Sequence, residues 1–280
     1  MRSRLLNVLT ALLFLLPLSA QAAPSIVQAV ALTSGSGSIT ITNSGDTLIC
    51  LLAGNGANSG SLTSIAYDGS TTAFTTDDGF RLVADGADGK DYYTGSWSIA
   101  SVTSGSHSVA LTMVNVTNAR VYLIEVSGLG SFDLAATGKY GNSASPVSNS
   151  ITPTVSGDLL LAGYVALSGG ITYSGLGSFT SQATQTTSPS NMLASYVQPT
   201  AGAITSGATM SASTFWMDYL VAYKAAGAGG TCTHAGITSA GAFAVPVAGT
   251  TVMRLKNGSF GTVDCSTVSY FQERGVFGVN

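Results

Sequence analysis

The sequence predicts an all-β protein, an antiparallel β-sandwich followed by a small, disulfide-closed β module at the C-terminus. Short runs rich in Val, Ile, Thr, Tyr and Phe alternate with clusters of Gly, Ser, Asn and Asp, which is the pattern of strands joined by turns. Beyond the N-terminal segment, no stretch keeps a 3.6-residue apolar period for more than about two turns, so no long amphipathic helix is expected. Charged residues make up only 8% of the 280 residues, far fewer than in ordinary soluble domains.

The first 22 residues have the three parts of a secretory signal peptide. Arg2 and Arg4 form a basic start, residues 5–18 are mostly apolar, and Ala20-Gln21-Ala22 is a small-x-small cleavage signal. The apolar run is too short to span about 30 Å of hydrocarbon, and no later stretch is long and apolar enough, so no transmembrane anchor is expected. These features predict a secreted, extracellular or cell-surface protein.

Residues 23–226 contain the candidate strands, which fall into two sets. The first set is residues 25–32, 38–42, 47–53, 62–67, 71–75, 92–99, 107–114 and 120–126, and the second is residues 150–154, 159–167, 178–182, 192–198, 207–211 and 215–224. Residues 47–53 and 159–167 are almost continuously apolar, which is typical of central strands covered on both faces. Asp68-Gly69 predicts a hairpin turn. The Gly- and Asn-rich residues 54–60 predict a loop. Their composition resembles a phosphate-binding loop, but no helix follows them to bind the phosphate.

The sequence has a weak internal echo. Each half has a Ser-Gly-Asp sequence before an apolar strand, at Ser44-Gly45-Asp46 and Ser156-Gly157-Asp158, and closes on a strand that contains Tyr-Leu and an aliphatic residue. The echo allows two tandem sandwiches that divide near residues 133–150, or one sandwich with two related halves. We expect one sandwich over residues 23–226, because residues 133–150 do not form a clean linker.

Three cysteines allow one disulfide and leave one thiol. Cys232 and Cys265 flank a compact segment, and export favours a disulfide between them. This C-terminal module, residues 231–280, follows a flexible Gly-rich linker at residues 227–230, and we expect it to dock on the sandwich or on a neighbouring subunit. Cys50 lies in a strand-like apolar run, so a buried thiol and an intermolecular disulfide are its two interpretations.

Several turn-and-strand motifs resemble a loose class of jelly-roll modules found in bacterial secreted, surface and phage-associated proteins. The motifs are Gly45-Asp46-Thr47-Leu48-Ile49, Ile65-Ala66-Tyr67-Asp68-Gly69, Gly105-Ser106-His107-Ser108-Val109, Arg120-Val121-Tyr122-Leu123-Ile124-Glu125-Val126-Ser127-Gly128 and Gly157-Asp158-Leu159-Leu160-Leu161. The resemblance covers roughly residues 23–226 and implies a concanavalin-like, jelly-roll sandwich, often with an attachment or binding role. The class carries no catalytic residues to transfer to this chain.

The best candidate for a binding site is an acidic and aromatic region. It contains five aspartates and three aromatic residues: Asp77, Asp78, Asp85, Asp88, Asp91, Tyr92, Tyr93 and Trp97. Aspartates on Gly-rich loops bind Ca²⁺ through oxygen, and we expect Asp85, Asp88 and Asp91 as ligands, although their spacing is not that of an EF-hand. The neighbouring rings could stack on a sugar. The alternatives are a solvated acidic loop and ordinary packing of aromatic residues in a strand.

The sequence offers little for nucleophilic or metal catalysis. Its two histidines, His107 and His234, lie in a strand and in the C-terminal module. Neither a Gly-x-Ser-x-Gly nucleophile elbow nor the spacing of zinc ligands is present. We therefore expect no enzyme, and no cofactor other than Ca²⁺.

Glutamates are equally scarce. A glycosidase needs paired carboxylates, whereas Glu125 and Glu273 are far apart in the sequence. Glu125 shares a strand face with apolar residues, so its pKa would rise unless it is paired. We expect a structural pairing with Arg120 or Lys224.

Composition and export together favour a protein that works through its surface. Removal of the signal peptide leaves eight basic and thirteen acidic side chains, a net charge of about −5, so no surface for nucleic acid is expected. Our first hypothesis is a non-enzymatic structural subunit of a surface assembly, such as a filament, sheath or coat, that binds copies of itself or other surface proteins through strand edges. The alternative is a lectin-like or adhesive module that binds glycans with Ca²⁺ through residues 77–97. A secreted hydrolase is the third hypothesis.

Overall fold

The computed structural model describes residues 23–32, 35–85 and 89–226, and these ranges contain strands and turns but no helix. Two antiparallel sheets contain most of the strands. The first sheet consists of β1 (Ser25–Leu32), β2 (Ser36–Ile41), β3 (Thr47–Tyr67), β4 (Thr75–Thr76), β5 (Arg81–Asp85), β6 (Asp91–Ile99), β7 (Gly105–Val116) and β8 (Arg120–Ser127). The second consists of β9 (Leu129–Ala135), β10 (Lys139–Ser143), β11 (Leu159–Ala166), β13 (Thr180–Gln185), β14 (Ser190–Val197) and β16 (Thr214–Ala225). β12 (Tyr173–Ser174) and β15 (Thr209–Met210) form a separate pair.

The chain fills the two sheets one after the other. In the first sheet β3 lies between β8 and β6, and in the second sheet β11 lies between β16 and β14. β3 and β11 follow the two Ser-Gly-Asp sequences, and β8 and β16 contain the two Tyr-Leu sequences. The internal echo of the sequence therefore corresponds to the same three-strand centre in each sheet.

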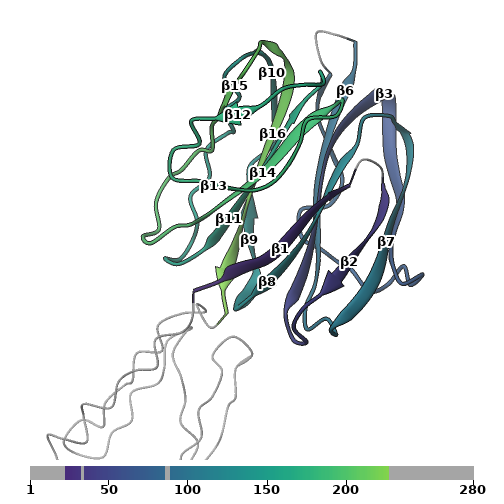
Figure 1. The fold of residues 1–280 in the computed structure, drawn as a ribbon, viewed down its shortest axis with the longest axis vertical. Helices are drawn as coiled ribbons and strands as arrows, with labels where there is room; N and C mark the ends of the chain where they lie inside the picture. The colour runs from purple at the N-terminus through teal and green to yellow at the C-terminus, as the bar shows by residue number, and fades with distance from the viewer. Residues whose placement is uncertain (1–22, 33–34, 86–88, 227–280) are drawn as a thin grey trace, which may run out of the picture.

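The two sheets face each other across a shared apolar core. Its buried members are Ile49, Leu51, Tyr122, Ile124 and Val126 from the first sheet, and Leu159, Leu161, Leu193, Tyr219, Val221 and Tyr223 from the second. In Figure 1 the first sheet, purple to teal, lies beside the second sheet, which is mostly green. Burying one large apolar side chain stabilises a fold by about 1.5–3 kcal/mol, so this shared face holds the two sheets together.

Both sheets are also covered on their outer faces. β2, β7 and the second part of β3 cover the first sheet and bury Ile39, Val109 and Leu111 against it. Connecting segments cover the second sheet and contribute Ile151 and Phe179. Because β3 and β11 are covered on both sides, they are apolar at nearly every position where they cross the core.

The Gly- and Asn-rich residues 54–60 belong to β3 and do not form the loop that the sequence predicts. β3 pairs first with β6 and β8 and then, after a bulge between Gly56 and Ser61, with β7. A β-carbon on Gly56 would lie 1.8 Å from the carbonyl oxygen of Asn115, so this close approach requires glycine. The glycines thus bend one strand from the inner layer to the outer layer instead of ending it.

Other differences from the sequence prediction occur at short or edge strands. Charged residues and glycines break the alternation in β5, β9 and β10, so the pattern does not predict these strands. Residues 150–154, predicted as a strand, make only an isolated bridge between Ile151 and Ile204. The Asp68-Gly69 turn is present, with positive φ angles of 47° and 82° as a type I′ turn requires. The signal peptide, the linker and the Cys232–Cys265 module lie outside the described residues.

Cys50 lies in the interior, on β3. It is a free thiol, fully buried, and burial raises the pKa of the thiol. A thiol in this position is protonated and out of reach of another chain, which agrees with the first of its two interpretations.

Candidate functional site

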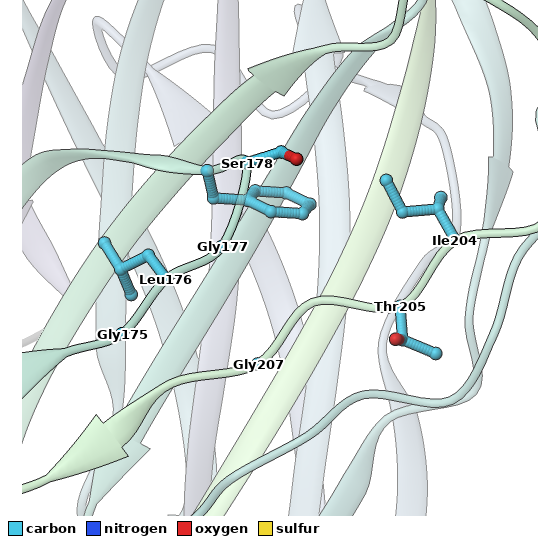
Figure 2. Close-up of a pocket in the computed structure, with 8 residues that line it drawn as sticks. Gly175, Leu176, Gly177, Ser178, Ile204, Thr205 and Gly207 are labelled. Carbon is cyan, nitrogen blue, oxygen red and sulfur yellow. The ribbon is translucent and has the colours of Figure 1, made fainter.

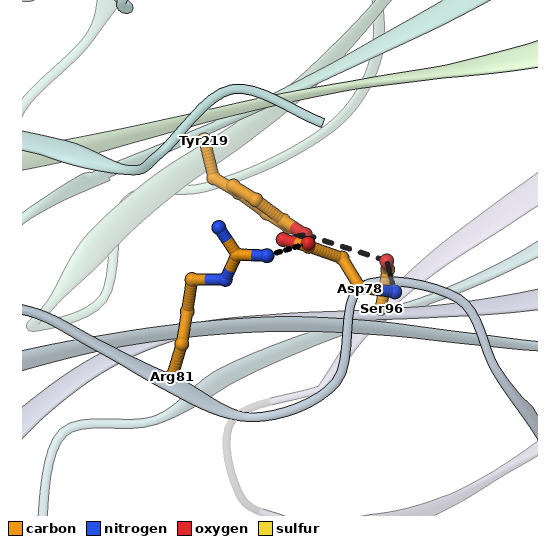
Figure 3. A network of polar contacts seen from close by, with 4 residues as sticks. All are labelled: Asp78, Arg81, Ser96 and Tyr219. Carbon is orange, nitrogen blue, oxygen red and sulfur yellow. Dashed lines mark hydrogen bonds and ion pairs between the residues drawn. The ribbon is translucent and has the colours of Figure 1, made fainter. Parts of the chain in front are cut away.

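Asp78 lies in the turn between β4 and β5, where the edges of the two sheets meet. Its carboxylate accepts a hydrogen bond of 2.7 Å from Tyr219 Oη on β16 and forms an ion pair with Arg81. Ser96 Oγ accepts a 3.1 Å bond from the backbone N–H of Asp78 and another of 3.3 Å from Tyr219 Oη. Figure 3 shows these four side chains converging. Asp78 therefore ties the first sheet to the second.

Asp77 makes a second bridge beside the first. It accepts a 2.8 Å hydrogen bond from Tyr223 Oη on β16 and a 2.9 Å bond from Ser98 Oγ on β6. Burial raises the pKa of Asp77, although both hydrogen bonds oppose this rise. The two acidic residues are thus held inward by tyrosines that sequence reasoning did not connect with them. The only sequence signal is the alternation of residues 215–224, which places both tyrosines on one face.

The three aromatic residues of the predicted binding region are packed in the interior. Tyr92, Tyr93 and Trp97 have exposed fractions of 0, 2 and 3%. Tyr92 stacks on Tyr140 with ring centroids 4.9 Å apart, and Tyr93 stacks on Phe80 at 5.0 Å. A ring must present a face to solvent in order to stack on a sugar. For these three rings the structure shows ordinary packing of aromatic residues in a strand, one of the two interpretations that the sequence allows.

The three expected calcium ligands are not shown together. Asp91 is buried, and its Oδ2 accepts hydrogen bonds from the backbone N–H of Ser59 at 3.0 Å and from Tyr93 Oη at 2.8 Å. Asp88 and the side chain of Asp85 lie outside the described part of the chain. Within that part, no three His, Cys, Asp or Glu side chains are grouped in a way that could hold a metal ion. The Ca²⁺ site stays a prediction.

Glu125 on β8 is fully buried, and its two expected partners bond elsewhere: Lys224 pairs with Asp133, and Arg120 Nε donates to the carbonyl oxygen of Pro189. The Glu125 carboxylate accepts hydrogen bonds from Gln28 Nε2 on β1 at 2.5 Å and from the backbone N–H groups of Thr42 and Asn43 at 2.8 and 2.9 Å, and the Thr42 side chain adds another. Burial acts to raise the pKa of this carboxyl, but the hydrogen bonds outweigh burial and leave the pKa below its usual value. Glu125 therefore fixes β1 and the turn before β3.

His107 on β7 is held by protein groups on both ring nitrogens. Its Nδ1 lies 2.7 Å from Asp68 Oδ2, its Nε2 lies 2.9 Å from the backbone oxygen of Thr103, and its ring stacks on Tyr67. The hydrogen bonds from His107 and from the backbone N–H of Ser108 lower the pKa of Asp68. This arrangement fixes the Asp68-Gly69 hairpin.

An open groove lies on the outer side of the second sheet, between two connecting segments. Residues 175–179 line one wall, and Ile204, Thr205 and Gly207 line the other. Figure 2 shows Leu176 and Ser178 on the first wall and Ile204 and Thr205 on the second. The lining consists of glycines, hydroxyls and apolar side chains, so it supplies no ionisable group for acid–base chemistry.

The sandwich has two lateral flanks that differ in charge. On one, which we call the uncharged flank, the edge strands β1 and β13 contact each other and neither carries a charged residue. On the other, the charged flank, the edge strands are β4, β5, β9 and β10; β4 carries two threonines, and the other three carry Arg81, Asp85, Asp133 and Lys139. A hydrogen bond of 2.6 Å from Gln185 Nε2 to the carbonyl oxygen of Ala31 joins the two strands of the uncharged flank.

Comparison with known proteins gives no relative: no protein-family model, no curated protein and no solved structure matches this chain. The described residues include no helix long and apolar enough to cross a membrane. The case for a function therefore rests on the geometry of the chain itself.

Proposed function

We propose that the mature chain is a non-enzymatic, extracellular structural subunit, built on a jelly-roll sandwich, that joins a surface assembly through its uncharged flank. The observation that supports the proposal is the pair of uncharged edge strands, β1 and β13. An edge strand presents unpaired N–H and C=O groups to any neighbouring strand, and proteins usually protect such edges with charged side chains. The charged flank carries this protection and the uncharged flank does not.

β13 is the better of the two strands for receiving a partner. It pairs with β14 alone, and Thr180, Ser181 and Thr184 are exposed along it. In β1, by contrast, the carbonyl of Ala31 already accepts the hydrogen bond from Gln185. A strand from a second copy that adds to β13 would gain main-chain hydrogen bonds. The small net charge of the mature chain keeps electrostatic repulsion between copies low.

Negative-stain electron microscopy of the purified mature chain tests the proposal. We expect ordered assemblies from the wild type and separate particles from a Ser181→Lys, Thr184→Lys double variant, because two ammonium groups beside the β13 edge oppose strand addition. Thr112→Lys is the matched control, since Thr112 is exposed on β7, which is paired on both sides by β2 and β3. A wild-type chain that stays monomeric at high concentration, or assemblies that survive both β13 lysines, would overturn the proposal.

A further inference from the structure

Three ionisable side chains lie at one level of the second sheet, on three neighbouring segments. Lys224 is on β16, and its Nζ lies 3.3 Å from Oδ1 of Asp133 on the adjacent strand β9. On the other side of β16, Leu159 of β11 pairs with Tyr223, so the antiparallel register carried one residue further places Asp158 opposite Lys224. The amine is thus flanked by two carboxyl groups.

A β-bulge aims Asp133 at this lysine. The pairing of β9 with β16 passes from Leu134 opposite Ala222 to Phe132 opposite Tyr223, so Asp133 is the extra residue of the bulge. Bulges change the direction of a side chain. Thr154 then fixes the carboxyl group, with its backbone N–H donating to Oδ2 at 2.7 Å and its Oγ1 donating to Oδ1 at 2.6 Å. Only 2% of the Asp133 side chain is exposed.

Asp158 is the third ionisable residue of the group, and the reason for burying its carboxyl group needs an explanation. It is fully buried, and apart from the contact with Asp133 its carboxyl oxygens have no hydrogen-bond partner among the described residues. Burial raises the pKa of Asp158 to about 7, and the neighbouring Asp133 adds to the rise. Hydrogen bonds from Thr154, Asp158 and Lys224 outweigh burial at Asp133 and lower its pKa. Asp158 therefore holds a proton more readily than the neighbouring Asp133, which is paired with the Lys224 amine.

We propose that Lys224 and Asp133 join in an intramolecular amide bond, with Asp158 as the group that transfers protons. The Lys224 ammonium group first gives one proton to the Asp133 carboxylate with which it is paired, which leaves a neutral amine beside a neutral carboxyl group. Nζ then attacks Cγ of Asp133, a C–N bond forms, and one C–O bond of the carboxyl group breaks. Asp158 gives its proton to the departing hydroxyl group, which leaves as water, and receives one proton from the nitrogen, so it ends as it began. Nothing is oxidised or reduced.

The geometry supplies the high local concentration of the reacting groups that this condensation lacks in water. Groups held in contact react with effective concentrations of about 10⁵–10⁸ M, which drives loss of water from a fixed amine and carboxyl pair. The product replaces two charges at a largely buried site by one neutral amide, which removes a desolvation cost. The bond would clamp the edge strand β9 to β16, whether or not the chain assembles.

The first half of the chain provides an internal contrast. By the echo, Asp46 corresponds to Asp158, and Ser127 of β8 takes the place of Lys224. Ser127 pairs with Ser25 of β1, and their hydroxyl oxygens lie 2.9 Å apart. This level has no amine, so no amide can form there.

Intact-mass spectrometry of the purified, reduced mature chain tests the proposal. We expect a mass lower than that of the sequence by one water molecule, and a branched peptide that joins Lys224 to Asp133 after proteolysis. Lys224→Arg, which keeps the positive charge, and Asp133→Ala should each show the full mass, and Asp158→Asn should leave most molecules unreacted. Circular dichroism confirms that each variant is folded. A folded wild type with the full mass, or a water loss that persists in Lys224→Arg, would overturn the proposal.

Discussion

The charged and the uncharged flank occupy equivalent positions at the two sides of the sandwich, but they differ in whether charged residues lie on their edge strands. On the charged flank, β5 and β10 carry Arg81 and Lys139, and Asp77 and Asp78 close the gap between the sheets by bonding to tyrosines of β16. On the uncharged flank, β1 and β13 carry only polar and apolar residues. Because charge beside an open edge opposes strand addition, this difference favours association at one side only.

Removing the Glu125 carboxylate should destabilise β1 and, with it, the uncharged flank. Glu125→Ala deletes the acceptor for Gln28 Nε2 on β1 and for two backbone N–H groups in the turn before β3. Thr42 and Asn43 are exposed and Gln28 Nε2 also contacts the carbonyl oxygen of Thr40, so water and that carbonyl can satisfy the freed donors. We therefore expect the free energy of unfolding to fall by about 2 kcal/mol, the net value of a hydrogen bond to a charged group. Urea denaturation measures this change. A loss well under about 1 kcal/mol would mean that pairing with β8 alone holds β1.

Asp158 should give the region beside the charged flank a pH dependence. Burial, with Asp133 nearby, raises its pKa from 3.8 to about 7. Between these values the folded chain holds a proton that the unfolded chain has lost, so stability falls as the pH rises through this range. In the Lys224→Arg variant, which keeps the free Asp133 carboxylate, we expect the free energy of unfolding to drop by about 2 kcal/mol between about pH 5 and pH 7, and by less when Asp158→Asn is added. Equal slopes for the two proteins in denaturation experiments would contradict this assignment.

Tyr223→Phe should weaken the contact between the two sheets at the charged flank, while the aromatic ring stays in the shared core. The substitution removes the 2.8 Å hydrogen bond to Asp77. We expect a loss of about 1 kcal/mol, the usual net value of such a bond. Tyr67→Phe is the matched control, because the buried Tyr67 hydroxyl has no hydrogen-bond partner in the described structure. Thermal unfolding of both variants should therefore shift only Tyr223→Phe, and equal shifts would show that the Asp77 bond contributes nothing.

Lysines on β13 should separate association from folding. Ser181 and Thr184 are exposed, so Ser181→Lys and Thr184→Lys should each change the stability of the dissociated chain by less than about 0.5 kcal/mol. Denaturation of the dissociated proteins measures this. A larger loss would mean that the lysines act on the fold itself, and their effect on assembly could then not be assigned to the strand edge.

Sequence reasoning succeeded where burial on both faces leaves a strong local signal. The apolar runs at residues 47–53 and 159–167 became central strands, and Asp68-Gly69 formed the predicted turn. The same reasoning missed β5 and β9, because edge strands are half exposed and tolerate Arg81, Asp133 and glycines that break the alternation. It also treated the glycines of residues 54–60 as a loop, because a glycine that permits close packing of strands has the same local pattern as one that makes a turn.

The predicted site depended on contacts that no local pattern contains. Asp77 and Asp78 have the composition of an acidic loop, yet their partners Tyr223 and Tyr219 lie 146 and 141 residues away. The identity of those partners follows from which strand edges meet in the sandwich. Trp97 is likewise a residue type that is common in binding sites. Its ring is buried because the outer layer of β2 and β7 covers the first sheet, and no local sequence pattern contains that information.

Hydrogen–deuterium exchange of the assembled and the dissociated mature chain tests strand addition at the uncharged flank most directly, because it reports which main-chain amides become protected. We predict new protection in the assembled form along β13, and unchanged exchange in β5 and β10. New protection confined to the charged flank, or no change in β13 on assembly, would contradict the central claim that copies of this protein join through the uncharged edge.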